Sequence, residues 1–192
     1  MVYYIKKDHN NKMGIRARAH VAVTELVKEI KAERVAEIGV WKAEMAYFVL
    51  TECNDFIKEY IGVDPYRVFD GSCAQTKKRG DKIFLSSIRK MSKFPQFFLI
   101  KEKSLFTAEM FPDKYFDLVY IDADHRYEAV SQDIKVWMPK VKDNGILCGH
   151  DYYRRWMSVK KAVQEVFGED CEKGKGTVWI ARMGNIINVN KR

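Results

Sequence analysis

The fold is decided by residues 116–152, which read FDLVYIDADHRYEAVSQDIKVWMPKVKDNGILCGHDY. This stretch opens with an apolar, β-branched run at Phe116–Ile121 and closes with another at Gly145–Gly149, each of the length of a buried strand. Between the two runs lies an apolar stripe at helical spacing, made of Val130, Ile134, Trp137, Met138 and Val141. A strand, a helix and a second strand in this order predict a parallel βαβ unit.

The rest of the chain repeats this alternation. Further strands are predicted at Arg34–Val40, Glu59–Val63, Gln96–Lys101 and Thr177–Arg182. Further helices are predicted over about residues 15–31, 42–52 and 77–93, and from Ser158, as N-cap, to Gly168. The alternation indicates an α/β fold with a doubly wound, mostly parallel sheet. We expect one compact domain, in which residues 1–33 form an N-terminal segment and helix and residues 34–192 form the core.

The net charge of the 192-residue chain is +8, from 34 Lys and Arg against 26 Asp and Glu. Residues 71–103 hold nine basic and two acidic side chains, a local charge of +7. A basic surface attracts anionic partners such as RNA, a nucleotide-sugar or a phosphorylated acceptor. The alternative is a solvated lysine face with no partner.

Cysteine usage and hydropathy indicate the compartment. Cys53, Cys73, Cys148 and Cys171 form no CxxC pair and have no histidine at zinc-finger spacing, so buried free thiols are expected. The first residues contain no apolar leader, and no apolar run is long enough to cross a bilayer. We therefore expect a cytoplasmic protein that does not contact a membrane.

Ligands of a doubly wound sheet bind beyond the carboxyl ends of its strands. In this chain the segments there are Glu37–Ala43, Asp64–Tyr66, Lys103–Ser104, Asp122–His125 and His150–Tyr152. A dinucleotide fingerprint would need glycines two and five residues after Gly39, where Trp41 and Glu44 stand, so NAD is poorly supported. Without a ligand, Gly39 would be explained equally well by a tight turn, and Asp64 by a cap.

VAEIGVWKAEM, residues 35–45, resembles the first motif of class I S-adenosylmethionine-dependent methyltransferases, with its acidic–x–Gly core. Asp64, in IGVDP, is similar to the acidic residue by which that family binds the ribose hydroxyls, and Ser104 matches a residue that contacts the adenine. Trp41 stands in place of the motif's second glycine, and Lys103 in place of an acidic residue. The resemblance implies cofactor binding by Glu37, Gly39, Trp41, Asp64, Ser104 and Asp122.

Residues 116–152 are similar to small Rossmann-like O-methyltransferases that carry an I-D-G-D-H-x-Y-E pattern, and distantly to catechol O-methyltransferase. The matching residues are Asp122, Asp124, His125, Tyr127 and Glu128, while Ala123 replaces the glycine. The resemblance covers roughly residues 34–183. It implies a seven-stranded Rossmann-like sheet and methyl transfer to a hydroxyl of a small molecule or sugar.

The same resemblance implies a divalent cation, Mg²⁺ or Mn²⁺, on Asp122, His150 and Asp151. If the strands before Asp122 and Asp151 are neighbours, the two carboxylates can share an ion. His150 replaces an acidic residue of the metal-dependent relatives, and imidazole favours manganese, iron or zinc over magnesium. The alternative is that Asp151 caps its loop and His150 is packed.

His125 and Asp122 are the candidate catalytic pair. His125 stands three residues after Asp122, where catechol O-methyltransferase has its catalytic lysine, and a histidine can take the proton of an acceptor hydroxyl. Trp41, Tyr127 and Tyr152 are candidates for contacting the cationic sulfur or for core packing. Asp124 and Glu128 suit the N-terminus of the following helix.

Three classes of function remain open. A small-molecule or sugar O-methyltransferase is favoured by residues 116–152, an RNA-directed methyltransferase only by the charge, and a degenerate Rossmann-like binding protein by Trp41 and Ala43. Against a base methylase, IDADH stands where an Asn/Asp-Pro-Pro-aromatic loop would be needed. Candidates for lining the acceptor pocket, or for a homodimer contact, are Tyr3, Tyr4, Tyr153 and Trp156.

Overall fold

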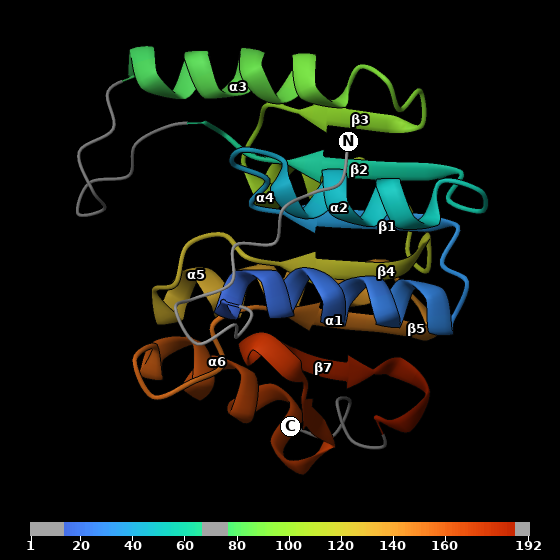
Figure 1. Ribbon diagram of the computed structural model, residues 1–192. Helices are drawn as coiled ribbons and strands as arrows, with labels where there is room; N and C mark the ends of the chain where they lie inside the picture. Colours follow the sequence, from blue (N-terminus) through green and yellow to red (C-terminus); the bar gives the residue numbers. More distant parts are fainter. Residues whose placement is uncertain (1–13, 67–76, 187–192) are drawn as a thin grey trace.

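A seven-stranded sheet forms the centre of the computed structural model, which describes residues 14–66 and 77–186 (Figure 1). The strands are β1 (Arg34–Ile38), β2 (Glu59–Val63), β3 (Phe97–Ile100), β4 (Phe116–Ile121), β5 (Val141–Gly149), β6 (Cys171–Lys173) and β7 (Trp179–Arg182). Their order is β3-β2-β1-β4-β5-β7-β6. The first five strands are parallel, and β7 runs antiparallel to β5 and β6. The doubly wound, mostly parallel α/β sheet predicted from the sequence is confirmed.

Helices cover both faces of the sheet. They are α1 (Ile15–Glu29), α2 (Glu44–Cys53), α3 (Lys77–Met91), α4 (Ser104–Ala108), α5 (Tyr127–Trp137) and α6 (Met157–Phe167). Short 3-10 helices lie at Met138–Lys140, Gly168–Asp170, Lys175–Thr177 and Met183–Asn185. Buried residues of α1, α2 and α3 share one core and those of α4, α5 and α6 the other. Helix α1 is thus part of the same hydrophobic core as the sheet.

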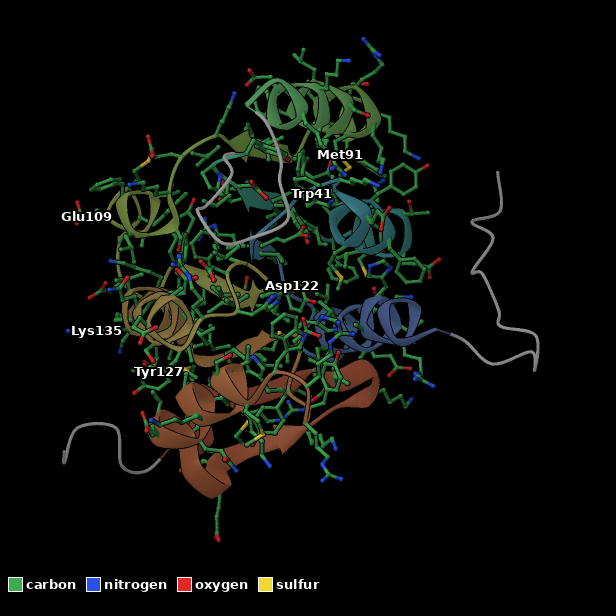
Figure 2. All side chains as sticks on the ribbon, turned by 90° about the vertical axis from the view of Figure 1, so that its left-hand side faces the viewer. Trp41, Met91, Glu109, Asp122, Tyr127 and Lys135 are labelled. Carbon is green, nitrogen blue, oxygen red and sulfur yellow. The ribbon has the colours of Figure 1, made fainter. Side chains whose placement is uncertain are left out.

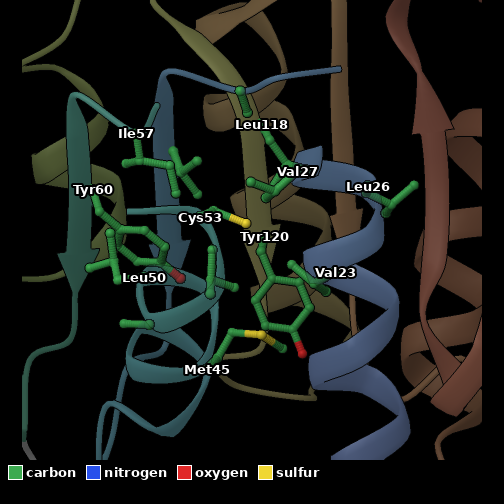
Figure 3. Close-up of a cluster of buried hydrophobic side chains, with 14 of the residues drawn as sticks. Val23, Leu26, Val27, Met45, Leu50, Cys53, Ile57, Tyr60, Leu118 and Tyr120 are labelled. Carbon is green, nitrogen blue, oxygen red and sulfur yellow. The ribbon is translucent and has the colours of Figure 1, made fainter. Parts of the chain in front are cut away.

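Alternation along β4 explains why the central strands are apolar throughout. Leu118 and Tyr120 face the core under α1 and α2, where they pack near Val27 and Leu50 (Figure 3), while Val119 faces the other core. All five are at most 2% exposed. A strand with helices on both faces buries every side chain, so its sequence shows no polar alternation.

The structure corrects four details of the predicted elements. Val141 begins β5 rather than ending a helix, because the chain turns through the 3-10 helix around Pro139 and continues as a nine-residue strand. Ser158 is not the N-cap of α6; Trp156 is, and the Ser158 hydroxyl donates instead to the His125 carbonyl oxygen at 2.6 Å. The sequence pattern did not predict α4 and β6, because five and three residues are too short to show a period.

The basic segment 71–103 lies on α3, β3 and the residues around them; residues 71–76 are outside the described part of the chain. Several of its cations have contacts within the molecule. Lys101 Nζ lies 2.6 Å from Asp81, and Lys90 donates to the carbonyl oxygen of Lys42 at 2.6 Å. These two cations are therefore engaged within the molecule. None of the described helices has the length and apolar character needed to span a membrane.

Candidate active site

A cavity of about 360 Å³ opens at the carboxyl ends of the parallel strands, the edge that faces the viewer in Figure 2. All five loop segments predicted to meet there contribute to it. The cavity is lined from those segments by Glu37, Gly39, Trp41, Asp64, Ser104, Asp122, His125 and His150, among others. The topology therefore brings together the residues that the sequence pointed to, with Asp122 and Trp41 near the centre of this edge (Figure 2).

Gly39 is required by a close approach of two backbones. Its φ is +95°, and a Cβ there would lie 2.2 Å from the carbonyl oxygen of Asp122. The loop after β1 thus crosses directly over the end of β4, and Asp122 N–H donates to the Ile38 carbonyl oxygen at 2.8 Å. Only glycine combines this φ with this contact.

Asp64 joins two of the loops that line the cavity. One carboxylate oxygen accepts the Trp41 N–H at 2.8 Å and the other accepts the Tyr66 N–H at 2.7 Å. Burial raises the pKa of Asp64, while these backbone hydrogen bonds oppose the rise. The carboxylate therefore does act as a cap, yet each oxygen keeps a second lone pair for a ligand hydroxyl.

Glu37 is a buried acid at the base of the cavity, only 2% exposed. The Tyr60 hydroxyl donates to it at 2.9 Å. Burial raises the pKa of Glu37 well above its usual value, and the hydrogen bond from Tyr60 lowers it only in part. Glu37 therefore supports the base of the cavity as a well-buried hydrogen-bonded group.

Ser104 lines the cavity, and its hydroxyl is hydrogen-bonded to two side chains of α5. That hydroxyl donates to Asp133 at 2.5 Å and accepts the Trp137 Nε1–H at 2.8 Å, both on α5. Burial raises the pKa of Asp133 to about 6. The donor of Ser104 is thus already used within the protein, so toward a ligand the hydroxyl can only accept.

Two carboxylates and two imidazoles meet where β4 and β5 end. His125 Nε2 lies 3.0 Å from Asp151 and 3.4 Å from Asp122, and His150 Nδ1 lies 3.4 Å from Asp151 and 3.6 Å from Asp122. We call these four residues the Asp-His cluster. Because β4 and β5 are paired neighbours, Ile121 opposite Gly149, the two acids come together as predicted.

The cluster shifts the pKa of each of its members. Burial would lower the pKa of His125 and His150, but hydrogen bonds and the charges of Asp122 and Asp151 raise them to about 9 and about 10. Burial would raise the pKa of the two aspartates, but the histidines lower it. At neutral pH the cluster is therefore two carboxylates balanced by two imidazoliums.

The turn before β7 sets the orientation of the His150 ring. Its Nε2 lies 3.0 Å from the Gly176 carbonyl oxygen, which can only accept, so Nε2 carries a hydrogen. Gly176 in turn touches α1, since a Cβ there would lie 2.3 Å from the Ala19 nitrogen. Nδ1 is consequently the atom of His150 that faces the two carboxylates.

The loop that carries His125 is restrained by contacts with Trp156 and Ser158 and by contacts within the loop. The Ser158 hydroxyl binds the His125 carbonyl oxygen, and the rings of Trp156 and His125 lie 4.7 Å apart. Asp124 accepts the Arg126 N–H at 2.9 Å and also binds its guanidinium, 2.6 Å away. His125 is thus presented to the cavity by a loop with fixed geometry.

A family model described as a methyltransferase domain matches residues 36–152, which is more than half of the chain. The chain belongs to this methyltransferase family. No curated protein gave a significant match to the sequence.

Solved structures share the fold of this methyltransferase at low sequence identity. CalS11, a calicheamicin methyltransferase, superposes with a TM-score of 0.66 at 16% identity, over 87% of this chain and 78% of its own. A Podospora anserina methyltransferase bound to S-adenosylhomocysteine (SAH) gives 0.61 at 15% identity, over 83% and 75%. An O-methyltransferase from Bacillus cereus in complex with SAH gives 0.58 at 13%, over 82% and 77%. The chain thus has the class I methyltransferase fold, as its motifs implied.

The donor atoms of the Asp-His cluster in this methyltransferase also fit a cation. One ligand atom each from Asp122, His125 and Asp151 lies within 4.8 Å of the other two. Two carboxylates and an imidazole suit Mn²⁺, Fe²⁺ or Zn²⁺ better than Mg²⁺. The predicted ligands were Asp122, His150 and Asp151, whereas the three residues with suitable spacing are Asp122, His125 and Asp151. His150 faces the same carboxylates from a more buried position.

The structure also adds residues that sequence reasoning missed. His20 of α1 lines the cavity, although it is more than 100 residues from Asp122. The Tyr120 hydroxyl lies 3.4 Å from Asp122. Neither carried a local signal: His20 lies within an amphipathic helix, and Tyr120 within an apolar strand.

Other aromatic candidates lie elsewhere. Of the three named for the sulfonium, only Trp41 lines the cavity. The Tyr127 hydroxyl binds Glu165 on α6, and Tyr152 is buried in the core under α5 and α6. Tyr3 and Tyr4 are outside the described residues.

The ion pairs of the cluster predict how stability depends on pH. A histidine whose pKa is higher in the folded than in the unfolded chain stabilises fully below about 6.5, and this contribution is lost as pH rises through the folded value. For His125 and His150, in the presence of chelator, we expect the free energy of unfolding in urea to fall between pH 7 and pH 9. Because His125 is partly open to solvent, screening limits the loss to about 1–2 kcal/mol.

The matched control is the double variant His125→Gln, His150→Gln. Its free energy of unfolding should be lower at pH 7 and nearly flat from pH 7 to pH 9. An equal slope in wild type and double variant would show that other groups titrate and that the histidines carry no extra proton.

Proposed function

We propose that this methyltransferase uses S-adenosylmethionine as donor and methylates a hydroxyl of a small molecule or sugar, with His125 as the proton acceptor. The observation that carries the proposal is a single cavity that runs from Gly39, Asp64 and Ser104 to the Asp-His cluster. A donor bound along the first three residues would place its reactive end beside the last. CalS11 is described as a TDP-rhamnose 3'-O-methyltransferase, which supports a sugar hydroxyl as the acceptor.

The cofactor supplies, when bound, an electrophilic methyl group on a sulfonium. Asp64 offers carboxylate lone pairs for two ribose hydroxyls, and Gly39 allows the loop after β1 to lie close to the ligand. Ser104, whose proton is held by Asp133, offers an acceptor to an amino group. Trp41 adds an aromatic face to the cavity wall, which suits a cation.

His125 takes the proton of the acceptor as the new O–CH₃ bond forms and the S–CH₃ bond breaks. Asp122 and Asp151 orient the ring and stabilise the imidazolium that results. Since the pKa of His125 is about 9, the neutral base is a minor form at pH 7. The rate should therefore rise with pH toward about 9, as the neutral form becomes populated.

A cation at Asp122, His125 and Asp151 is the second candidate, favoured by the spacing of their ligand atoms. It would supply Lewis-acid activation of the hydroxyl in place of proton transfer to His125. In that case Asp122, His125 and Asp151 would hold the cation, and His125 would release its proton on binding.

Calorimetry and chelation test these proposals in sequence. We expect SAH to bind the full chain, and Asp64→Ala to weaken binding about tenfold by removing the hydroxyl acceptor. Absence of SAH binding to the wild type would favour a degenerate binding protein. With a panel of hydroxylated sugars, we expect methyl transfer to persist in excess chelator.

Loss of activity in chelator, with recovery on adding Mn²⁺, would support the cation site and contradict the role of His125 as the proton acceptor. Tight, salt-dependent RNA binding together with methylated RNA as product would instead support an RNA-directed enzyme. Each result is distinct, because SAH binding, chelator sensitivity and RNA methylation are measured separately.

A further inference from the structure

A second hollow lies beside the Asp-His cluster, among the segment after β5, helix α6 and strand β6. Its volume is about 440 Å³, within the range of small-molecule pockets. It is lined by Tyr152, Tyr153, Arg154, Lys160, Gln164 and Lys173. We call it the cationic hollow, because these six described lining residues include three cations and two aromatic rings and no carboxylate.

The three cations are uncompensated in the part of the chain that the structure describes, where none of Arg154, Lys160 and Lys173 forms an ion pair or a side-chain hydrogen bond. Neighbouring cations outside the hollow do: Lys161 lies 3.8 Å from Glu165, and Lys175 lies 3.4 Å from Glu25. Like charges brought together from a loop, a helix and a strand repel one another, so an anion bound among them would be stabilised.

The hollow adjoins the proposed reaction centre at the same edge of the sheet. Lys173 pairs with Trp179, and Trp179 pairs with Gly149, the residue before His150. Two strand spacings place Lys173 about 10 Å across the sheet from Gly149. The segment after β5 also connects the two sites. Tyr153, which lines the hollow, is two residues after Asp151 of the cluster, and its N–H donates to the Asp151 carbonyl oxygen at 2.9 Å.

The chemistry of the lining fits one class of ligand. Arg154 has the fork geometry that binds phosphate oxygens in pairs, and the two lysines add point charges. Tyr153 supplies partly exposed aromatic surface with a polar end, which suits a base or a ribose, while the largely buried Tyr152 ring adds apolar surface to the wall. A free carboxylate or a single phosphate would use only part of this lining.

We propose that the cationic hollow binds the nucleoside diphosphate of the acceptor, which makes the substrate a nucleoside diphosphate sugar. The diphosphate lies among Arg154, Lys160 and Lys173, and the sugar extends past Asp151 so that its hydroxyl reaches His125. This assignment rests on the proposed function, because it places a sugar hydroxyl at the Asp-His cluster.

The test uses uridine and thymidine 5′-diphosphates as probes on the full chain, by calorimetry, with inorganic pyrophosphate and uridine alongside. We expect the nucleoside diphosphates to bind at least tenfold more tightly than pyrophosphate or uridine. The double variant Lys160→Ala, Lys173→Ala should weaken nucleotide binding at least tenfold and leave SAH affinity unchanged. Lys160→Ala alone is measured as well, and Lys161→Ala is its matched control, since it removes one charge from a neighbouring residue that faces Tyr127 and Glu165 instead.

The outcomes separate this proposal from the proposed function. SAH binding without nucleotide binding overturns the cationic hollow and leaves the donor assignment intact. A loss of affinity in Lys161→Ala equal to that in Lys160→Ala shows a general charge effect and overturns it, and pyrophosphate binding as tightly as the nucleotides overturns the nucleoside part. A short RNA that displaces the nucleotides at much lower concentration would assign the hollow to RNA instead.

Discussion

His125→Ala is expected to lower kcat about 10²–10⁴-fold, the range usual for loss of a general base. The reason is that His125 lines the cavity and that two carboxylates, 3.0 and 3.4 Å from its Nε2, orient the ring and stabilise its protonated form. SAH affinity should stay within about twofold, because the variant leaves Gly39, Asp64 and Ser104 in place. Steady-state kinetics and calorimetry on the same preparation measure both quantities.

Lys135→Gln provides the control for His125→Ala. Lys135 is an exposed cation of α5 that does not line the cavity. Its kcat should change less than about twofold. The base assignment is wrong if His125→Ala turns over like the wild type, or if the pH–rate profile keeps its rise toward pH 9 in the variant.

Gly39→Ala is expected to destabilise the protein by about 3–5 kcal/mol and to abolish SAH binding. The added Cβ would lie 2.2 Å from the Asp122 carbonyl oxygen, at a φ of +95° that alanine rarely adopts. Relief of the contact must move either the loop after β1 or the end of β4, and both line the cavity. Urea unfolding gives the free energy, and calorimetry gives the SAH affinity.

Alanine variants of two other glycines separate the cost of the positive φ from the cost of the contact with Asp122. Gly168 has a φ of +55°, but a Cβ added there would meet no described atom within 4 Å, so Gly168→Ala should lose only about 1 kcal/mol to backbone strain. Gly14 has open space and an ordinary φ of −61°, so Gly14→Ala should lose no more than the N-cap preference for glycine over alanine, about 1 kcal/mol. If Gly39→Ala resembles Gly168→Ala, the contact with Asp122 is not what requires glycine.

Much of the fold could be predicted because local pattern and tertiary structure agree in the central strands. β2 and β4 have the predicted bounds, since each is a buried run that ends at a polar residue where the chain leaves the sheet. The short edge elements could not be predicted in this way. β6 has three residues and is held by pairing with β7, a partner that the local sequence does not specify.

Hydrophobic period and chain order are local properties, so the amino-acid sequence alone was enough to establish the α/β class, the loop segments around the cavity and the presence of Asp122, His125, His150 and Asp151 after two strands. How these groups act on one another depends on the folded chain. Folding placed Asp151 3.0 Å from a histidine 26 residues away, oriented the ring of His150 through Gly176, and set Asp133 behind Ser104. The physical reason is that hydrogen bonds and charge interactions depend on distances of a few ångströms between segments, and strand pairing and helix packing set those distances.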